Sequence, residues 1–520
     1  MPPPDGRSGV RSPQRGDRDR MAQVIEGLTL EGDGWDTALR ELPCDDPRSE
    51  AGTLDRFRDL LYPSRRRSSD REKRGKEMSL KAGAYRVNIT PPVGFPMAGY
   101  SGRTKGSEWV DDELFGKALV LDDGETQVAI VTTDLIGPPP ELVAEVRGMV
   151  ERKTGIPAGN VMLCSSHTHF GPALKRLSYL PDEAQEEFHE SYVQNLARLL
   201  AGAVYMAYQS RRDARIGWGV GKAPQLVFNR RTKRPDGKVV MSWRPPKPEE
   251  AKELSFGPTD PDVGVLRVDG SDGRPIASMI AFACHPVCGV DRLYAISADY
   301  PGYAMGVVER IRGGVCMFAL GCAGNIVPIQ REGESRRWIG TALGAEALKV
   351  MQGLEMREDV KLRVLRRSIE LPLKRLPSPE EARREVEELE RRLAELEREG
   401  APPEEISALR GRLVKARNAL RLARETKGEE TVETEIQAIR IGDLILACLP
   451  GEVFVEIGLS IKERHRSVFV LSLCNDSLSY VPTASAYDEG GYEPEWTKLE
   501  RGTGEKLLDE MMKLLEGIGG

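Results

Sequence analysis

The run VMLCSSHTHFGP at residues 161–172 joins a strand-like segment to two closely spaced histidines. Residues 161–164 are apolar, as in a buried β-strand, and the Gly171-Pro172 pair marks a turn. Upstream, QVAIVTT at 127–133 is a second strand-like run, and a helical stretch extends from Pro140 to about Thr154. A strand, a helix and a strand in succession predict an α/β fold.

Outside this run, short β-branched segments continue to alternate with helical ones. Residues 186–208 carry leucine and valine at helical spacing, which predicts an amphipathic helix. Gly442-Asp443 separates two strand-like runs and predicts a tight hairpin. Further strands are expected at 263–268, 277–283, 315–319, 434–441, 444–449 and 468–473. We therefore expect one large domain at 80–519, with mixed β-sheets flanked by helices.

Residues 1–79 differ from the rest of the chain in composition. They are rich in charged residues, Pro, Ser and Gly and show little apolar periodicity. Such a segment cannot bury enough apolar surface to offset its ordering entropy, so a disordered leader is expected. A misassigned start is the alternative, because Met78 directly precedes the first strand-like segment.

The charge and hydropathy of the chain exclude several classes of protein. Lys and Arg number 75 against 81 Asp and Glu, a net charge of −6, which is too balanced for a nucleic-acid-binding protein. No uninterrupted apolar run approaches the length of about 18 residues that a membrane span requires. No signal-peptide pattern is visible either, so a cytoplasmic location is expected.

Residues 378–427 form a separate helical module between strand-like segments. Ser378, followed by Pro379 and by Glu381, has the pattern of a helix start with a capping box. Apolar residues then recur in a heptad-like stripe, which a break at 400–403 divides in two. The pattern predicts an inserted antiparallel helical hairpin. Self-association or partner docking is one role for it, and a solvated hairpin without a function is the alternative.

The chemistry of the chain depends on its few histidines, five in all. His167 and His169 directly follow the strand at 161–164. In extended backbone, residues two apart share a face, so both imidazoles can point into one cleft at a strand end. The pair predicts a metal or catalytic site, with a hydrogen-bonded polar loop as the alternative.

Two further strand ends supply candidate ligands. His285 follows the apolar run 280–284 and precedes a proline, and Glu452 follows the run 446–449 and a Pro-Gly turn. A lone histidine or glutamate at such a position is most often structural. Catalytic zinc, however, usually takes three protein ligands, and histidine and glutamate are among its preferred types. Together with the histidine pair, these residues make a zinc site a reasonable hypothesis.

These motifs resemble those of the neutral/alkaline, non-lysosomal ceramidase family, over roughly residues 82–519. The similarity rests on an ordered set of pieces, none of which is specific alone. They are GAYRVNITP at 83–91, MAGY at 97–100, SHTHFGP at 166–172, Asn229-Arg230, His285, ADYPGY at 298–303, PGEVF at 450–454, YVPT at 480–483, Tyr487 and Tyr492-Glu493.

The resemblance implies a zinc ion with four protein ligands, namely His167, His285, Glu452 and Tyr480. It also implies that His169 acts beside the metal as a general base or a supporting partner. Arg230 would hold the polar head or carbonyl of the substrate, and Tyr492 would support the oxyanion. These roles are chemically consistent, because zinc lowers the pKa of bound water and polarises an amide carbonyl, while an imidazole can take a proton.

Two departures from the family pattern bear on the substrate. Val327 occupies the position at which the family carries a functional serine, so a serine-assisted route and ceramide itself are both in doubt. The chain also ends soon after the tyrosine motifs, with no room for the immunoglobulin-like domain that follows in the family. A short form of the enzyme is expected.

The sequence thus predicts a zinc-dependent hydrolase of a linear amide bond that uses metal-activated water. The substrate would be a small or lipid-like N-acyl amide. Two alternatives stay open: a zinc esterase or deacylase acting on a soluble substrate, and a non-catalytic metal-binding interaction protein whose working part is the hairpin.

Overall fold

The computed structural model describes residues 79–177 and 180–519. All of these residues belong to one compact unit, residues 65–520. The leader expected at residues 1–79 lies, except for Ser79, outside the described residues.

An eight-stranded mixed sheet forms the first half of the fold. Its two edge pairs, β4–β5 and β12–β14, are parallel, and the pairs between them are antiparallel. Each parallel pair is joined through a helix, as the crossover between parallel strands requires. In sheet order the strands are β14 (Val315–Leu320), β12 (Pro275–Phe282), β11 (Asp262–Gly270), β6 (Arg212–Lys222), β1 (Lys81–Asn88), β3 (Phe115–Asp122), β4 (Gln127–Thr133) and β5 (Val161–Ser165).

A second, four-stranded sheet comes from the C-terminal part of the chain. Its strands, in sheet order, are β16 (Leu362–Pro372), β17 (Thr431–Ile441), β18 (Leu444–Cys448) and β20 (Val468–Leu471). The predicted hairpin at Gly442-Asp443 is confirmed, because Ile441 pairs with Leu444 across it. Gly442 has a φ of 64°, which glycine adopts without strain.

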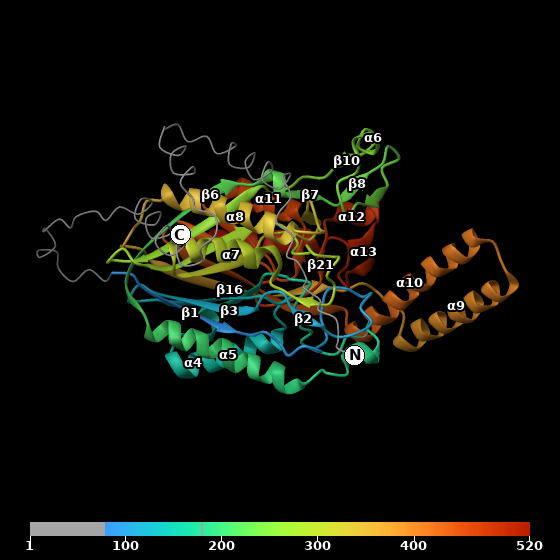
Figure 1. The fold of residues 1–520 in the computed structure, drawn as a ribbon, viewed down its shortest axis with the longest axis horizontal. Helices are drawn as coiled ribbons and strands as arrows, with labels where there is room; N and C mark the ends of the chain where they lie inside the picture. The colour runs from blue at the N-terminus through green and yellow to red at the C-terminus, as the bar shows by residue number, and fades with distance from the viewer. Residues whose placement is uncertain (1–78, 178–179, 520) are drawn as a thin grey trace, which may run out of the picture. The chain divides into compact units, whose positions relative to one another are not determined.

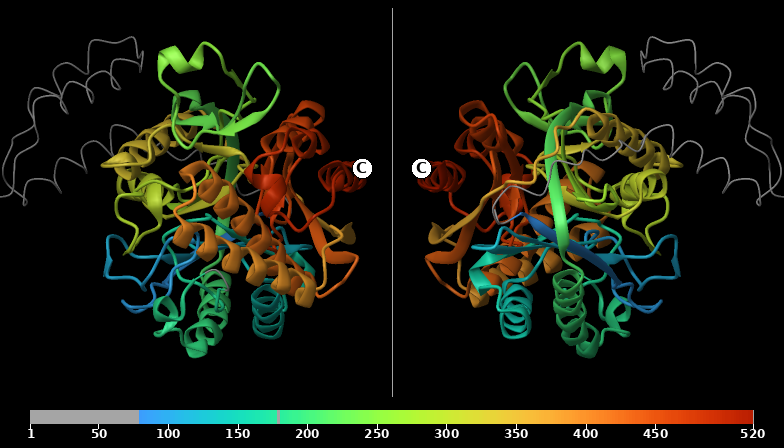
Figure 2. Two further views of the ribbon diagram at one scale, coloured as in Figure 1. Left: turned by 90° about the vertical axis from the view of Figure 1, so that its right-hand side faces the viewer. Right: turned by 90° about the vertical axis from the view of Figure 1, so that its left-hand side faces the viewer.

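The two sheets pack face to face, and helices cover their outer faces. Leu119, Ile130 and Met279 of the first sheet share one apolar cluster with Leu446 and Phe469 of the second. The outer face of the first sheet is covered by α4 (Pro140–Thr154), α5 (Glu190–Gln209), α7 (Asp299–Arg312) and α8 (Ser335–Gln352), and that of the second by α11 (Val455–Arg464) and α14 (Thr503–Gly519). Figure 1 shows α4 beside α5, and Figure 2 shows α14 at the C-terminus from two sides. The predicted α/β fold with helix-flanked mixed sheets is confirmed.

Short elements complete the structure around the strand ends. They are β2 (Trp109–Val110), β7 (Val227–Asn229), β8 (Arg231–Lys233), β9 (Val239–Met241), α6 (Pro248–Ala251), β10 (Ser255–Phe256), β13 (Ala295–Ile296), β15 (Ile326–Pro328), β19 (Glu452–Val453), β21 (Tyr480–Val481), α12 (Ala484–Glu489) and α13 (Tyr492–Trp496), with single 3₁₀ turns at Ala158–Asn160, Asp182–Gln185 and Pro224–Leu226. Strand β7 pairs with β15, and β19 pairs with β21.

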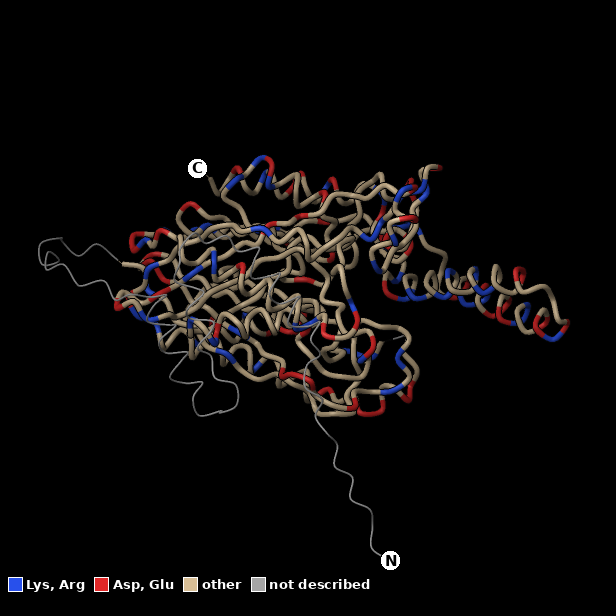
Figure 3. The backbone as a smooth tube through the Cα atoms, turned by 45° about the horizontal axis from the view of Figure 1, so that its top comes forward, with Lys and Arg blue, Asp and Glu red and all other residues tan. Residues whose placement is uncertain are grey.

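The segment between β16 and β17 consists of two helices, α9 (Pro379–Glu399) and α10 (Pro403–Thr426). Ser378 caps α9, and its hydroxyl accepts a hydrogen bond from the backbone N–H of Glu381. The two helices lie side by side (Figure 1). Their apolar stripes pack against each other in a cluster that includes Leu389, Leu396 and Leu413. Charged residues of both signs follow the outside of the pair (Figure 3). The stripes are therefore largely covered within the hairpin itself, and self-association through it stays a prediction.

The helices that cover the sheets carry apolar residues on the faces that pack against them. In α5, for example, Leu196, Leu200 and Val204 are buried at helical spacing. Across residues 79–177 and 180–519, we find no helix that is both long enough and apolar enough to cross a membrane.

A buried carboxyl group at the end of β4 makes the stability of the fold depend on pH. The side chain of Asp134 is buried, and its Oδ2 accepts a hydrogen bond of 2.8 Å from the backbone N–H of Phe115. Burial raises the pKa of Asp134 from 3.8 to about 7, although Lys117 acts to lower it. The folded protein therefore binds this proton more tightly than the unfolded chain does.

Asp134→Asn is accordingly expected to become more stable than the wild type as the pH rises. The folded state favours protonated Asp134, so this proton stabilises the fold fully below pH 3.8, and the stabilisation is lost as the pH rises to about 7. Over that pH range the free energy of unfolding of the wild type should fall by up to about 1.4 kcal/mol per pH unit relative to that of the variant. Urea unfolding of both proteins at about pH 5 and pH 8 measures this difference, and a difference independent of pH would contradict the prediction.

Candidate metal centre

His167 lies two residues beyond the end of β5 in a constrained backbone conformation. Its φ is 70°, in the left-handed region that a residue other than glycine rarely adopts. The backbone N–H donates to the carbonyl oxygen of Leu135 at 2.9 Å, and Nδ1 lies 2.6 Å from that of Ile136. Such strain, on the order of 1–3 kcal/mol, persists where surrounding contacts fix the residue, and functional sites are a common place for it.

His285 lies beyond the end of β12 and is fixed in the same manner. Its backbone N–H donates to the carbonyl oxygen of Ile326 at 3.1 Å, and its Nδ1 lies 2.5 Å from that of Ala323. The side chain is almost completely buried. Ala323 lies in the loop after β14 and Ile326 begins β15, so this segment sets the orientation of the ring.

His169 connects the two histidine segments. Its backbone N–H donates to the carbonyl oxygen of Pro286 at 3.3 Å, which joins the loop after β5 to the loop after β12. Its Nδ1 lies 3.0 Å from the carbonyl oxygen of Gly99, and its Nε2 lies 3.3 Å from Nε2 of His167. The ring packs edge-on against Tyr100 at 5.2 Å between centroids.

Glu452, which follows β18 of the second sheet, brings a carboxylate to the histidines. Its Oε2 lies 3.3 Å from Nε2 of His167 and 3.1 Å from Nε2 of His285. Glu452 begins β19, and the parallel pairing of β19 with β21 places Tyr480 directly beside it. The ring of Tyr480 is stacked on that of His285 at 6.4 Å between centroids.

The three imidazoles and the carboxylate fit the donor set of a divalent metal ion. Ligand nitrogens of His167, His169 and His285 all lie within 4.8 Å of one another. Every Nδ1 faces a backbone carbonyl, which can only accept, so Nδ1 carries the proton and Nε2 presents a lone pair. Convergent lone pairs beside a carboxylate repel one another unless a cation lies among them. This tautomer, set by a backbone carbonyl, is the one that metal-bound histidine adopts in proteins.

Burial and the neighbouring charges keep the imidazoles of His169 and His285 neutral. Burial lowers the pKa of His285 to about 4 and lowers that of His169 well below 6.5, with His167 and His285 contributing to the second shift. Burial acts to raise the pKa of Glu452, but the adjacent His167 and His285 lower it well below its ordinary value. Neutral imidazoles and an ionised carboxylate are the protonation states in which such groups bind metals.

Arg230 reaches the centre from the loop between β7 and β8, where it is held by a buried ion pair. Its Nε donates to Oε1 of Glu493 at 2.8 Å, and a terminal nitrogen donates to the carbonyl oxygen of Gly324 at 2.7 Å. The second oxygen of Glu493 accepts from Arg231, also at 2.8 Å. The side chain of Glu493 is completely buried, so one carboxylate holds two buried guanidinium groups.

Tyr492, the first residue of α13, completes the cluster. Its ring contacts that of Tyr480 at 5.8 Å, and the guanidinium of Arg230 lies 5.4 Å and 5.7 Å from the ring centroids of Tyr480 and Tyr492. Trp243 packs edge-on against Tyr492 at 5.6 Å. The structure thus brings together, through these contacts, all seven residues singled out in the sequence: His167, His169, His285, Glu452, Tyr480, Arg230 and Tyr492.

Val327 offers no hydroxyl to this centre. It lies in β15 and is completely buried in a small apolar cluster with Phe228 and Val287, against which Tyr100 packs. The side chain at this position therefore serves packing.

Two residues of the centre were given no role in the sequence analysis. Glu493 is adjacent to Tyr492 in the quoted motif, but nothing in the sequence shows which cations it pairs with. Gly99 belongs to the quoted MAGY motif. With a φ of 100° it lies so close to His169 that an added Cβ would be 2.6 Å from the ring. A glycine required for close approach could have been inferred from that motif.

Gly99→Ala is expected to disturb the centre without unfolding the protein. The added methyl group would displace the ring of His169, and the positive φ at this position disfavours alanine. Because the Gly99 carbonyl orients His169, we expect metal affinity or turnover to fall about 10–100-fold, as for other changes in groups that orient ligands. Metal titration and steady-state kinetics measure the loss. Gly102→Ala is a matched control, because nothing lies within 4 Å of the Cβ it would add.

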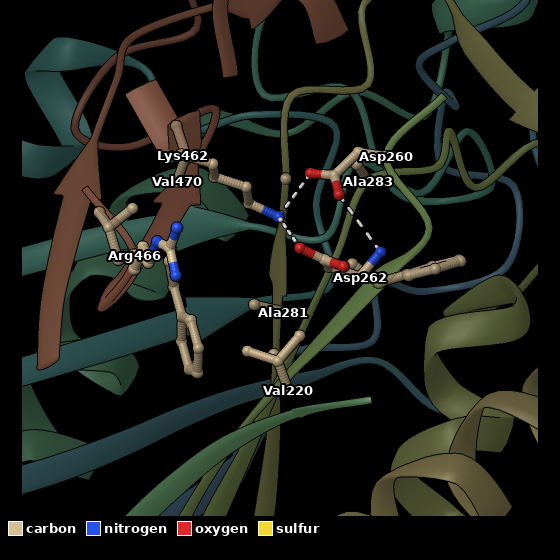
Figure 4. Close-up of a pocket in the computed structure, with 13 residues that line it drawn as sticks. Val220, Asp260, Asp262, Ala281, Ala283, Lys462, Arg466 and Val470 are labelled. Atoms are coloured by element: carbon tan, nitrogen blue, oxygen red, sulfur yellow. Dashed lines mark hydrogen bonds and ion pairs between the residues drawn. The ribbon is translucent and has the colours of Figure 1, made fainter. Parts of the chain in front are cut away.

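A separate cavity lies between the first sheet and α11 and contains none of the predicted site residues. Lys462 enters it from α11 and pairs with Asp260 at 2.6 Å and Asp262 at 3.3 Å (Figure 4). Asp262 also pairs with Lys222 at 3.0 Å, so these charged groups already have partners. The cavity is therefore distinct from the histidine cluster.

The two packed sheets and the convergent donors define an α/β protein with a centre compatible with a metal ion. Residues 81–319 match the family model described as neutral/alkaline non-lysosomal ceramidase, N-terminal. This match confirms the resemblance to that family found in the sequence.

Individual relatives agree with this assignment. Neutral ceramidases B and A of Dictyostelium discoideum are each 26% identical over 151 residues, 29% of this chain. The matched region spans only 20% of the length of either relative. A neutral ceramidase from Pseudomonas aeruginosa has a similar fold, with a TM-score of 0.63 and 21% identity over 85% of this chain and 75% of that one. A structure described as ceramidase complexed with C2 gives a TM-score of 0.62 at 18% identity, with the same coverage.

Proposed function

We propose that this protein is a zinc-dependent hydrolase of linear amide bonds, a ceramidase-like N-acyl amidohydrolase. The observation that carries the proposal is the convergence on one point of His167, His285 and Glu452, three side chains of the types that catalytic zinc prefers. The match of residues 81–319 to the ceramidase family supports the type of bond that is cleaved.

His167, His285 and Glu452 would hold the metal, with Tyr480 as the fourth ligand. Glu452 is within 3.3 Å of both imidazole nitrogens, and β19–β21 pairing keeps Tyr480 beside it. Zinc bound there would supply a water of lowered pKa and would polarise the amide carbonyl. A phenol whose pKa burial raises well above 10 would stay protonated without the metal.

His169 is the residue placed to move a proton at the centre. Its Nδ1–H is engaged by the Gly99 carbonyl, so its Nε2 is the atom that can accept a proton. Nε2 lies only 3.3 Å from the His167 nitrogen proposed to bind the metal. A proton accepted there could next pass to the leaving amine, the usual sequence for a general base that becomes a general acid.

Arg230 and Tyr492 would act on the substrate side. Both lie against Tyr480, and the phenol of Tyr492 stays protonated because burial raises its pKa. A phenolic O–H can donate to an oxygen on which negative charge develops. Arg230 has fixed partners in Glu493 and Gly324, so it would add positive charge at a constant position. The Arg230 guanidinium would therefore already be in place to bind the polar head or carbonyl of the substrate.

Val327 favours a metal-centred route and a substrate other than ceramide. The family's serine is absent at this position, and hydrolysis through activated water needs no serine hydroxyl. The same observation supports an esterase or deacylase acting on a soluble substrate as the second candidate. A protein that binds metal without turnover is the third.

A substrate series separates these candidates. The full chain is assayed with ceramide, with N-acyl amides of decreasing chain length and with the matched esters, and the released acid is quantified in each case. Faster cleavage of N-acyl amides is the expected result. Cleavage of esters alone would favour the esterase, and absence of any product across the series, with metal bound, would overturn the enzyme proposal.

A further inference from the structure

The short helix α13 is held at its C-terminal end by side chains from the inserted segment. The last carbonyls of a helix have no partners within it and must find them elsewhere. In α13 the carbonyl of Glu493 accepts from the N–H of Thr497 at 3.0 Å. The carbonyl of Pro494 accepts from Lys374 Nζ at 2.5 Å. The carbonyl of Glu495 accepts from Asn418 Nδ2 at 2.7 Å, and that of Trp496 accepts from a terminal nitrogen of Arg421 at 3.1 Å.

The groups that bind these carbonyls are themselves well ordered by their surroundings. Asn418 is buried on α10, and its Oδ1 accepts two hydrogen bonds from Arg421, at 3.2 Å and 2.8 Å. The guanidinium of Arg421 also lies 5.4 Å from the ring centroid of Trp496. A cation at the C-terminal end of a helix is favourable electrostatically. Lys374 lies just before the hairpin, so all three donors come from the insertion or its base.

At the opposite end of α13 the backbone itself is weakly constrained, although Arg231 donates a hydrogen bond of 2.8 Å to the carbonyl oxygen of Gly490. Gly490 and Gly491 precede it, both at positive φ, 72° and 101°. Two glycines in succession leave the chain free to take other conformations once contacts are lost. The position of α13 therefore depends on the contacts of its side chains and of its carbonyls.

We propose that the 378–427 hairpin is a positioning element for the candidate centre, in which Asn418 and Arg421, with Lys374, hold α13 by its last three carbonyls. The effect on the reaction rests on the proposed function, in which Tyr492 of α13 acts on the substrate. The same helix carries Glu493. Glu493 in turn orients Arg230. Side chains of α10 would thus affect the reaction by holding α13 in position, without touching the substrate.

The test compares Asn418→Leu, Arg421→Met and the double variant with Arg410→Met. Leucine and methionine keep the size of the side chain and favour the helix, so α10 is expected to fold. Arg410 lies on the same helix but pairs with Glu397 of α9 at 2.7 Å, which makes it a matched control. Arg421→Lys retains a cation near the Trp496 carbonyl and serves as the conservative variant.

Hydrogen exchange gives a readout that does not depend on activity. Loss of two carbonyl partners is expected to speed exchange at Trp496 and Thr497 about tenfold or more in the double variant. Arg410→Met should leave it unchanged, and Arg421→Lys should restore part of the protection. Unchanged exchange in the double variant, or an equal change in the control, would overturn the proposal whatever the activity.

Kinetics then test the link to the centre. We expect kcat to fall about tenfold in the double variant while metal content stays near wild type, because the proposed metal ligands lie outside α13. Faster exchange at α13 with unchanged kcat would overturn the positioning role. A wild type that hydrolyses no amide or ester would instead sink the proposed function, while the exchange result would still decide whether the hairpin holds α13.

Discussion

His167→Ala is expected to purify with little or no bound metal and to lose at least about a thousandfold in turnover. The variant removes one of two imidazole nitrogens within 3.3 Å of Glu452 Oε2. Loss of His167 leaves a single imidazole beside Glu452 and Tyr480, which is a weaker donor set for zinc, and without the metal no activated water is supplied. Elemental analysis and initial rates on an N-acyl amide, measured on the same preparation, test both parts.

His189→Ala is the matched control for this experiment. His189 is two-thirds exposed and lies far along the chain from the strand ends, with only a weak pairing to Glu187 at 3.7 Å. The control should keep wild-type metal content and rate. Equal zinc in His167→Ala and His189→Ala would contradict the ligand assignment, whereas loss of metal in both would point to a general effect of removing a histidine.

Glu493→Gln is expected to lower the free energy of unfolding by about 3–5 kcal/mol. The substitution keeps the size of the side chain but removes the charge that compensates Arg230 and Arg231, both nearly fully buried. A buried cation left without its partner is strongly destabilising, because its desolvation is no longer offset. Arg231 keeps a second partner, Glu489 at 3.3 Å, so Arg230 should account for most of the loss.

Denaturant unfolding of Glu493→Gln beside Glu495→Gln measures this contribution. Glu495 belongs to the same helix but pairs with Lys415 at the surface, where an ion pair contributes only about 0–1 kcal/mol. The expected order is a large loss for Glu493→Gln and a small one for the control. A loss below about 1 kcal/mol in Glu493→Gln would show that the buried network does not hold Arg230 as described.

The strand ends of the centre could be predicted from the sequence because apolar runs are a local signal. The run at 161–164 and the run before His285 both form strands that end beside the predicted ligands. Local patterns of turn residues and of leucine spacing likewise predicted the hairpin at Gly442-Asp443 and the helices of the insertion. Each of these features depends on a few neighbouring residues.

Contacts between distant segments could not be read in this way. Glu452 meets His285 only because the second sheet packs on the first, and no spacing in the sequence encodes that approach. The strand-end pattern offered Glu452 as one candidate ligand, and the family resemblance gave it a definite role. The pairing of Glu493 with two arginines, and of Asn418 with α13, depends on how the insertion packs against a helix about 75 residues later. Polar residues of this kind look like ordinary surface positions until the fold is known.

Hydrolysis of an N-acyl amide before and after metal removal is the most direct test of the central claim. The full chain is assayed as purified, after exhaustive chelation and after return of zinc, with the released fatty acid and amine both quantified. We predict equimolar products from the purified protein, loss of activity on chelation and its recovery with zinc. Hydrolysis that survives complete removal of the metal would contradict the account.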